Sequence, residues 1–247
     1  MINAHDDLKI RIVAHRGDQT SHVENTLKAF RQAVDAGAEF AECDIQFTRD
    51  LIPVVIHDDH LKRLCDLALH VSRLDLVDLK ELCYPYFKLL TLNKLLVWLK
   101  ENPSLTLFVE IKADIRVRLS AEEVASHLKK KIPTGLLPRL VLISESASTL
   151  QTCKKQMKCA IGWVAEGEDR PDAELEKQLE YIFMPYTKAN AITAWHDRGV
   201  KVGLYTINEA NLAREMLDLD ADLIETDHFS SMLAELEGEL KGHRETD

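Results

Sequence analysis

Hydrophobic positions along the chain alternate between short extended runs and longer amphipathic stretches. Nine runs are short, apolar and rich in Val, Ile, Leu and Phe, which is typical of buried strands: residues 10–15, 40–47, 53–57, 105–112, 140–144, 159–165, 181–186, 200–207 and 222–226. Between most of them, apolar residues recur at helical spacing: residues 25–37, 92–102, 120–131, 147–156, 172–179, 190–199, 209–220 and 231–240. Alternation of this kind predicts βαβ units and a parallel sheet.

The count of nine strands is one more than an eight-stranded barrel needs, and loop length explains the difference. Only residues 48–52 separate the second strand from the third, which is too short for a parallel crossover and suits a hairpin. We therefore expect an α/β fold, a (β/α)8 TIM barrel with a short antiparallel β-hairpin extension after strand 2, formed by a single domain over residues 1–247. An open doubly wound sheet is the alternative, but no GxGxxG motif follows the first strand.

The charge balance narrows the range of partners. Acidic residues outnumber basic ones by 41 to 31, and the formal net charge is −10. Such a surface repels nucleic acids and anionic membranes, so we expect a small-molecule substrate and no nucleic acid. The most apolar stretch, residues 88–100, is interrupted by polar residues and is typical of an amphipathic helix, so we expect no stable membrane insertion. The sequence carries no indication of the oligomeric state.

Cysteine usage bears on the cellular compartment. The five cysteines form no CxxC pair, and their odd number argues against a secreted disulfide framework. The opening residues contain neither a basic region nor the apolar run of a signal sequence. These features predict a cytoplasmic protein.

Acidic side chains occupy one face of two predicted strands. Side chains alternate along a strand, so Glu42 and Asp44 share a face while Cys43 between them faces the helices. By the same rule Glu110 shares a face with Lys112. Burying an unpaired carboxylate is too costly unless it protonates or finds a cation. Three carboxylates at barrel strand ends offer hard oxygen ligands for Mg²⁺ or Ca²⁺; salt bridges with a neighbouring Lys or Arg are the alternative.

Two predicted strands end in histidine. His15 lies in "VAHRG" and His57 in "VVIHDD". Imidazole titrates near neutral pH, so the two could form an acid/base pair beside a metal, although either could instead be structural. Arg16 offers a planar fork of donors suited to a phosphate, and Lys112 supplies a point charge.

The motifs together resemble those of the glycerophosphodiester phosphodiesterase family. The segments that carry the resemblance, in order, are "HRG", "VENTLKAF", "AECDIQFTRDLIPVVIHDDHLKR", "VEIK", "YTIN" and "DLIETD". They run from about Ile12 to His228. The ordered set HRG…ENT…ExD…PVVxHD…ExK is specific, whereas a single HRG or ExD would be weak.

This resemblance implies a TIM barrel that uses a divalent cation to hydrolyse glycerophosphodiesters to sn-glycerol 3-phosphate and an alcohol. Carried over motif by motif, it implies three groups of site residues: metal ligands Glu42, Asp44 and Glu110; catalytic residues His15 and His57; and phosphate-binding residues Arg16 and Lys112. Glu24 and Asn25 match the "ENT" motif, where Asn25 either caps the following helix or contacts substrate. The sequence leaves open which histidine is the acid, and whether water or the substrate's own hydroxyl attacks.

Several positions depart from the family pattern. Val23 replaces a usual proline, and Leu51 replaces a favoured glycine in the hairpin loop, where we expect a different turn. Tyr205 replaces a common tryptophan, and we expect it to line the substrate pocket or the core. Glu145 replaces a frequent phenylalanine; it either favours a cationic leaving group such as choline or lies on the exposed rim.

Two other functions remain open from the sequence. The first is a lysophospholipase D-like activity on monoacyl substrates, because residues 60–90 are apolar enough to form an acyl channel. The second is a catalytically inactive barrel that binds phosphate, which the intact set of carried-over residues argues against.

Overall fold

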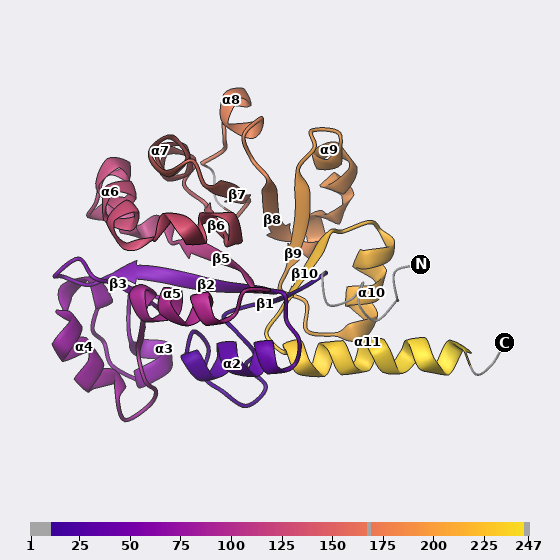
Figure 1. Cartoon of the computed structure of the whole chain (residues 1–247), viewed down its shortest axis with the longest axis horizontal. Helices are drawn as coiled ribbons and strands as arrows, with labels where there is room; N and C mark the ends of the chain where they lie inside the picture. The colour runs from indigo at the N-terminus through magenta and orange to yellow at the C-terminus, as the bar shows by residue number, and fades with distance from the viewer. Residues whose placement is uncertain (1–10, 167–168, 245–247) are drawn as a thin grey trace.

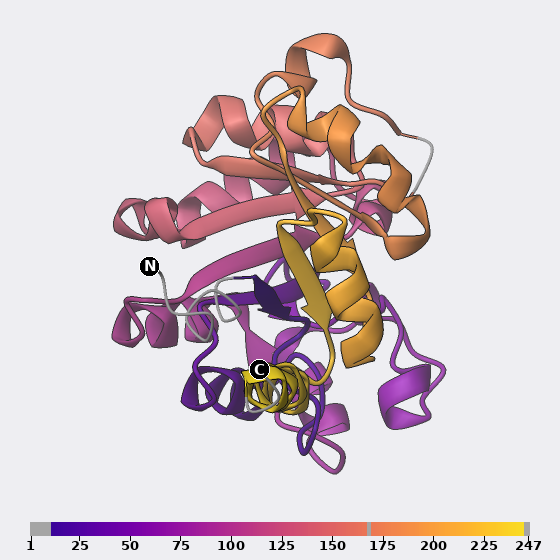
Figure 2. The same cartoon turned by 90° about the vertical axis from the view of Figure 1, so that its right-hand side faces the viewer.

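The chain forms a closed barrel of parallel strands surrounded by helices (Figures 1 and 2), in a computed structural model that describes residues 11–166 and 169–244. Within these residues the eight parallel strands are β1 (Ile12–Ala14), β2 (Phe40–Phe47), β5 (Thr106–Ile111), β6 (Leu140–Ser144), β7 (Ala160–Val164), β8 (Tyr181–Pro185), β9 (Lys201–Tyr205) and β10 (Leu223–Thr226). Strand β1 pairs with both β10 and β2, which closes the barrel. The predicted (β/α)8 architecture is confirmed.

The expected hairpin extension is present. Strand β3 (Pro53–Val55) runs antiparallel to β2, as the short connection requires. A further strand, β4 (Leu90–Thr91), pairs antiparallel with β3; sequence reasoning missed it because two residues are too few to show a period. In the hairpin loop, Leu51 itself takes the left-handed conformation, with φ of 59°, in place of the glycine that would adopt it more easily.

Helices cover the outside of the barrel and form a cap beside it. The outer helices are α2 (Leu27–Asp35), α5 (Leu92–Glu101), α6 (Ala121–Lys131), α7 (Ala147–Met157), α8 (Ala173–Glu176), α9 (Ile192–His196), α10 (Ala210–Asp218) and α11 (Phe229–Arg244). The cap contains α3 (Lys62–Cys65), the 3-10 turn Val71–Arg73 and α4 (Leu76–Cys83), on the side of the barrel next to β3 (Figure 1). Further 3-10 turns are Ala113–Val117, Thr134–Arg139 and Tyr186–Ala191.

The sequence predicts neither stable membrane insertion nor a signal sequence. Among the described residues, no helix combines the length and the apolar character needed to cross a bilayer. Residues 1–10, on which the expectation about a signal sequence rests, lie outside the described part of the chain.

The buried hydrophobic residues of the barrel form two layers, one between the strands and the outer helices and one inside the barrel. Side chains such as Cys43 and Ile45 point outward from β2 into the layer between strands and helices. The barrel interior is filled by a smaller cluster: Val13, Phe108, Val141, Ile143, Val164, Phe183 and Leu223. The alternation predicted along β2 is therefore present, and Glu42 and Asp44 point to the inside, toward the carboxyl ends of the strands.

A close backbone approach fixes the loop that follows β1. Gly17 has φ of +83°, and a Cβ atom there would lie 2.7 Å from the carbonyl carbon of Ala29 in α2. Gly199 also has a positive φ, +74°, but a Cβ atom there would meet nothing within 4 Å. The two glycines therefore separate the cost of backbone conformation from the cost of a steric overlap.

We predict that Gly17→Ala destabilises the protein more than Gly199→Ala does. The left-handed conformation alone costs an L-residue about 1–2 kcal/mol, whereas Gly17→Ala adds an overlap with a packed helix worth about 1–3 kcal/mol more. Urea unfolding of both variants measures the difference. Equal losses of unfolding free energy would contradict the close packing of this loop against α2.

Candidate active site

Three carboxylates meet at the carboxyl ends of two neighbouring strands. Glu42 and Asp44 come from β2 and Glu110 comes from β5, where Asp44 and Glu110 are register partners. Ligand oxygens of the three lie within 4.8 Å of one another. The side chains are almost fully buried, with exposed fractions of 1%, 0% and 8%. The sequence-predicted cluster is therefore brought together in space.

The protonation of this cluster is strongly perturbed. Burial raises the pKa of Glu42 well above its usual range, and the neighbouring carboxylates Asp44, Glu225 and Glu110 raise it further. Burial also raises the pKa of Glu110 to about 7, although Lys112 opposes the shift. Burial would raise the pKa of Asp44 too, but Arg16 and Lys112 outweigh it and lower the value to about 2. The cluster thus lacks enough positive charge to ionise fully.

Two of the carboxylate oxygens have no hydrogen-bond partner. Glu42 Oε1 and Asp44 Oδ1 are buried and accept no hydrogen bond among the described residues. Buried polar atoms are almost always paired, so orphaned oxygens in one cluster indicate that a further group belongs there. A hard divalent cation fits these donors, because carboxylate oxygens are the ligands that Mg²⁺ and Ca²⁺ prefer.

The two predicted phosphate-binding cations lie against the same carboxylates. Arg16 Nε is 3.0 Å from Asp44 Oδ2, and Lys112 Nζ is 2.7 Å from Glu110 Oε1 and 3.6 Å from Asp44 Oδ1. The alternative of salt bridges within the cluster therefore holds for Asp44 and Glu110. It does not extend to Glu42, whose ion-pair partner among the described residues is His15, at 3.9 Å.

Two residues in the loop between β1 and α2 adopt a left-handed backbone conformation and contact the carboxylates. Arg16 and Asn25 have φ of 56° and 57°, and the Arg16 backbone N–H donates to Glu42 Oε2 at 3.1 Å. Asn25 does not cap α2: its Nδ2 donates to Asp44 Oδ2 at 2.9 Å, and Thr26 is the N-cap residue. The cap interpretation of Asn25 is therefore wrong. The asparagine instead orients Asp44, and strained residues held by several contacts are typical of functional loops.

His15 and His57 face one cavity in similar ways. His15 Nδ1 contacts Asp227 Oδ1 at 2.7 Å, and His57 Nδ1 contacts Asp58 Oδ1 at 2.5 Å. Each imidazole thus keeps Nε2 for another contact, and His57 Nε2 lies 3.2 Å from Lys112 Nζ. Burial would lower the pKa of His15, but Glu225 and the hydrogen bond with Asp227 outweigh it and raise the value.

The cavity between the histidines has a volume of about 200 Å³. His15, Arg16, His57, Glu110 and Lys112 all line it. The cavity therefore gathers the two imidazoles, both cations and one of the carboxylates that the sequence singled out. Its small size suits a compact ligand.

Two of the positions that depart from the family pattern, Tyr205 and Glu145, differ in how they lie relative to the cavity. Tyr205 lines the cavity, as expected, and its hydroxyl is buried without a hydrogen bond among the described residues. Glu145 is not among the described residues that line it. Burial raises the pKa of Glu145, whereas Lys112 opposes the shift and Glu166 adds to it. Glu145 thus lies within electrostatic reach of the site.

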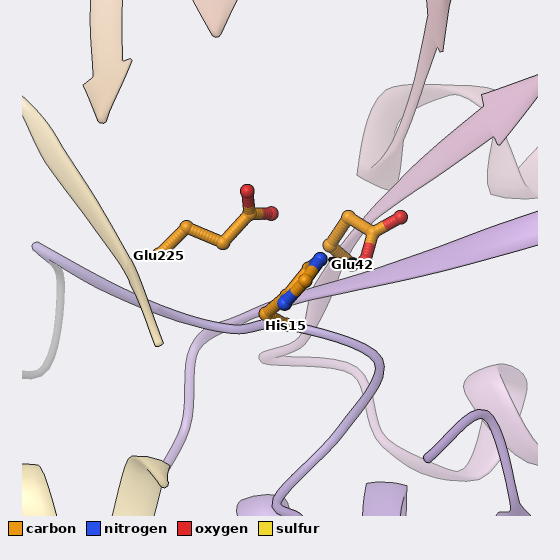
Figure 3. Close-up of side chains that lie close together, drawn as sticks. All are labelled: His15, Glu42 and Glu225. Atoms are coloured by element: carbon orange, nitrogen blue, oxygen red, sulfur yellow. Dashed lines mark ion pairs between the residues drawn. The ribbon is translucent and has the colours of Figure 1, made fainter. Parts of the chain in front are cut away.

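Sequence reasoning missed two acidic residues at the end of β10. Glu225 is 4% exposed, and Figure 3 shows it extending toward Glu42 and the ring of His15. Ligand atoms of these three lie within 4.8 Å of one another, and Glu225 Oε1 has no hydrogen-bond partner among the described residues. Asp227 holds His15, as described above. The alternation rule that linked Glu42 with Asp44 would have placed Glu225 and Asp227 together had it been applied to "DLIETD".

Comparisons with known proteins point to one family. The family model described as the glycerophosphoryl diester phosphodiesterase family matches residues 15–231. The human glycerophosphodiester phosphodiesterase 1 is 46% identical over 72 residues, covering 26% of this chain and 22% of the human protein. A glycerophosphodiester phosphodiesterase from Caldanaerobacter subterraneus subsp. tengcongensis is 39% identical over 75 residues, covering 30% of this chain and 31% of that protein. These matches span less than a third of either relative.

The fold likeness extends over the whole barrel. A phosphodiesterase from Oleispira antarctica, solved in complex with sn-glycerol-3-phosphate, superposes with a TM-score of 0.78 at 22% identity, covering 94% of this chain and 99% of that one. At this identity the likeness establishes the architecture alone. Because the family model spans most of the residues, from the first histidine motif to the helix after β10, the chain belongs to the glycerophosphoryl diester phosphodiesterase family.

Proposed function

We propose that this protein is a phosphoric diester hydrolase that cleaves glycerophosphodiesters to sn-glycerol 3-phosphate and an alcohol. The observation that carries the proposal is the convergence of Glu42, Asp44 and Glu110 with His15 and His57 at one end of the barrel. Family membership supports the same activity.

In this proposal Glu42, Asp44 and Glu110 hold one divalent cation, Mg²⁺ or Ca²⁺. Their orphaned oxygens and raised pKa values support it, because a cation would satisfy both. When bound, such a cation polarises a phosphoryl oxygen and neutralises negative charge that develops on the phosphate. Arg16 and Lys112 line the same cavity and would bind the remaining phosphate oxygens.

The hydrogen bonds support different roles for the histidines. A lysine ammonium can only donate hydrogen bonds. The hydrogen bond between Lys112 and His57 Nε2 therefore requires a lone pair on that nitrogen. We assign His57 as the base that accepts the proton of the attacking oxygen, whose donor in the overall hydrolysis is water. His15, whose pKa is raised by Glu225 and Asp227 against the effect of burial, is then the acid that protonates the departing alkoxide.

The cavity favours deacylated substrates over monoacyl ones. A volume of about 200 Å³ suits a glycerophosphate unit, and the described apolar residues that line it are few: Ile143, Val164, Phe183 and Tyr205. An inactive phosphate-binding barrel is also disfavoured, because the carboxylates, imidazoles and cations that such a reaction would need lie together at one end of the barrel.

The five cysteines are free and buried, which supports a cytoplasmic location.

We expect His15→Ala and His57→Ala each to lower kcat on glycerophosphocholine by at least ~10²-fold, because a positioned acid or base contributes ~10²–10⁴-fold. His60→Ala is the matched control, since His60 is exposed and follows His57 in the same segment of the chain. Steady-state kinetics with circular dichroism measure activity and folding together. Turnover within a factor of a few of wild type would remove that histidine from the mechanism.

Removal of the cation should abolish activity and leave the fold intact. EDTA is expected to stop turnover, and adding back Mg²⁺, Ca²⁺ or Mn²⁺ is expected to restore it and to raise Tm, because a ligand that binds only the native state stabilises it. Glu42→Gln should lose the metal-dependent rise in Tm, whereas Glu101→Gln, at the exposed last position of α5, should keep it. Full turnover in excess EDTA would contradict the proposal.

Glu145 tests the choice of leaving group. If its carboxylate attracts a cationic alcohol, Glu145→Gln should lower kcat/KM for glycerophosphocholine relative to glycerophosphoglycerol by a few-fold, the scale of a partly screened charge pair. Assaying lysophosphatidylcholine in parallel tests the monoacyl alternative. An unchanged ratio between the two glycerophosphodiesters would remove Glu145 from specificity.

A further inference from the structure

A second cavity lies outside the catalytic pocket, between α2 and α5. Its volume is about 440 Å³, more than twice the roughly 200 Å³ of the catalytic cavity. It is lined by residues 21–23 and Thr26, by the N-terminal half of α2, by Lys94 in the first turn of α5, and by residues 86–90. The two helices lie side by side (Figure 1), with the rings of Phe30 and Trp98 packed 6.3 Å apart. The walls are thus held by the core of the protein.

The rim of this cavity carries a concentration of positive charge. Lys28, Arg31, Lys88 and Lys94 line it, and no carboxylate does so within the part of the chain that the structure describes. None of the four forms an ion pair with a described residue. This occurs in a protein whose acidic residues outnumber its basic ones by 41 to 31. The charge of these four side chains is therefore not neutralised by an ion pair with the described residues.

The backbone adds to the positive potential. Lys28 lies in the first turn of α2 and Lys94 in the first turn of α5, and neither turn contains an acidic residue. The N-terminal end of a helix carries partial positive charge, so a lysine there is unfavourable for the helix itself. An anion in the cavity would offset this repulsion and would interact with the side chains and with both helix ends.

The floor of the cavity is apolar. Leu27, Phe87 and Leu89 line it beneath the cations, and Tyr86, which is 51% exposed, stands at its edge. A bare inorganic ion would leave this surface in water. A ligand with an anionic head and an uncharged organic part would use both the floor and the rim.

We propose that this cavity binds a phosphorylated ligand, with its phosphate held by Lys28, Arg31, Lys88 and Lys94 and its uncharged part on the apolar floor. A phosphate suits the site because several lysine point charges and one guanidinium fork match its oxygens. The ligand is either a free phosphate ester or the headgroup of an anionic phospholipid. The site is separate from the catalytic cavity, so the proposal does not depend on the proposed reaction.

Lysine footprinting of the wild-type protein tests the site directly. Acetylation with mass spectrometry would compare Lys28, Lys88 and Lys94 with the exposed Lys129, Lys130 and Lys131 of α6. The probes are inorganic phosphate, glycerol phosphate, and vesicles of phosphatidylcholine with or without phosphatidylglycerol, at matched ionic strength. Protection of the cavity lysines by the soluble phosphates assigns a free ester, and protection by anionic vesicles alone assigns a headgroup. Absence of protection, or equal protection of the α6 lysines, would overturn the proposal.

A matched pair of variants supplies the second test. The triple variant Lys28→Gln, Lys88→Gln and Lys94→Gln is compared with Lys129→Gln, Lys130→Gln and Lys131→Gln, which changes the net charge equally. Each basic residue near an anionic surface contributes about a fivefold factor, so the cavity variant should bind its ligand about 10²-fold more weakly than the control. Turnover of soluble glycerophosphodiesters should stay near wild type in both. Equal affinity in the two variants would contradict the proposal without bearing on catalysis.

Discussion

The structure depends on how buried negative charge is balanced at one end of the barrel. Glu42, Asp44, Glu110 and Glu225 lie together with exposed fractions of 8% or less. Removing a carboxylate from water costs several kcal/mol unless a cation or several hydrogen bonds compensate. Arg16 and Lys112 compensate for Asp44, whereas the pKa values of Glu42, Glu110 and Glu225 stay raised. Glu42 and Glu225 also each keep one oxygen without a hydrogen bond among the described residues. The four carboxylates therefore outnumber the two cations that contact them.

The barrel makes this crowding possible. Parallel strands end at a common rim, so inward-facing residues on β1, β2, β5 and β10 reach one another although they are far apart in the sequence. The packed cluster around Phe108 and Phe183 lies beneath them in the barrel interior. Outside the rim, Arg63 of the cap binds Glu24 through two contacts of 2.6 and 2.7 Å, and Glu24 also contacts Arg16. The cap thus helps to fix one of the two cations of the site.

Much of this arrangement could be predicted because it follows from short-range rules. Strand alternation predicted that Glu42 and Asp44 share a face and that Cys43 faces the helices, and the short loop before Pro53 predicted the hairpin. Other features depend on long-range contacts. Nothing near Asn25 indicates that it holds Asp44 rather than capping a helix, and the contact of His15 with Asp227 joins residues from opposite ends of the chain. The cavity between α2 and α5 could not be predicted either, because its cations are spread over residues 28–94 and meet only in the folded chain.

The most direct measurement is the number of protons that the protein releases when it binds a metal ion. Titrating Mn²⁺ into the protein by calorimetry near pH 7, in buffers of different ionisation enthalpy, gives both the stoichiometry and the number of protons released. We predict one ion per chain with net proton release, because burial raises the pKa of Glu110 to about 7 and a bound cation favours the ionised carboxylate. Absence of binding, or binding that releases no protons and persists in Asp44→Asn, would show that a cation does not balance the buried charge.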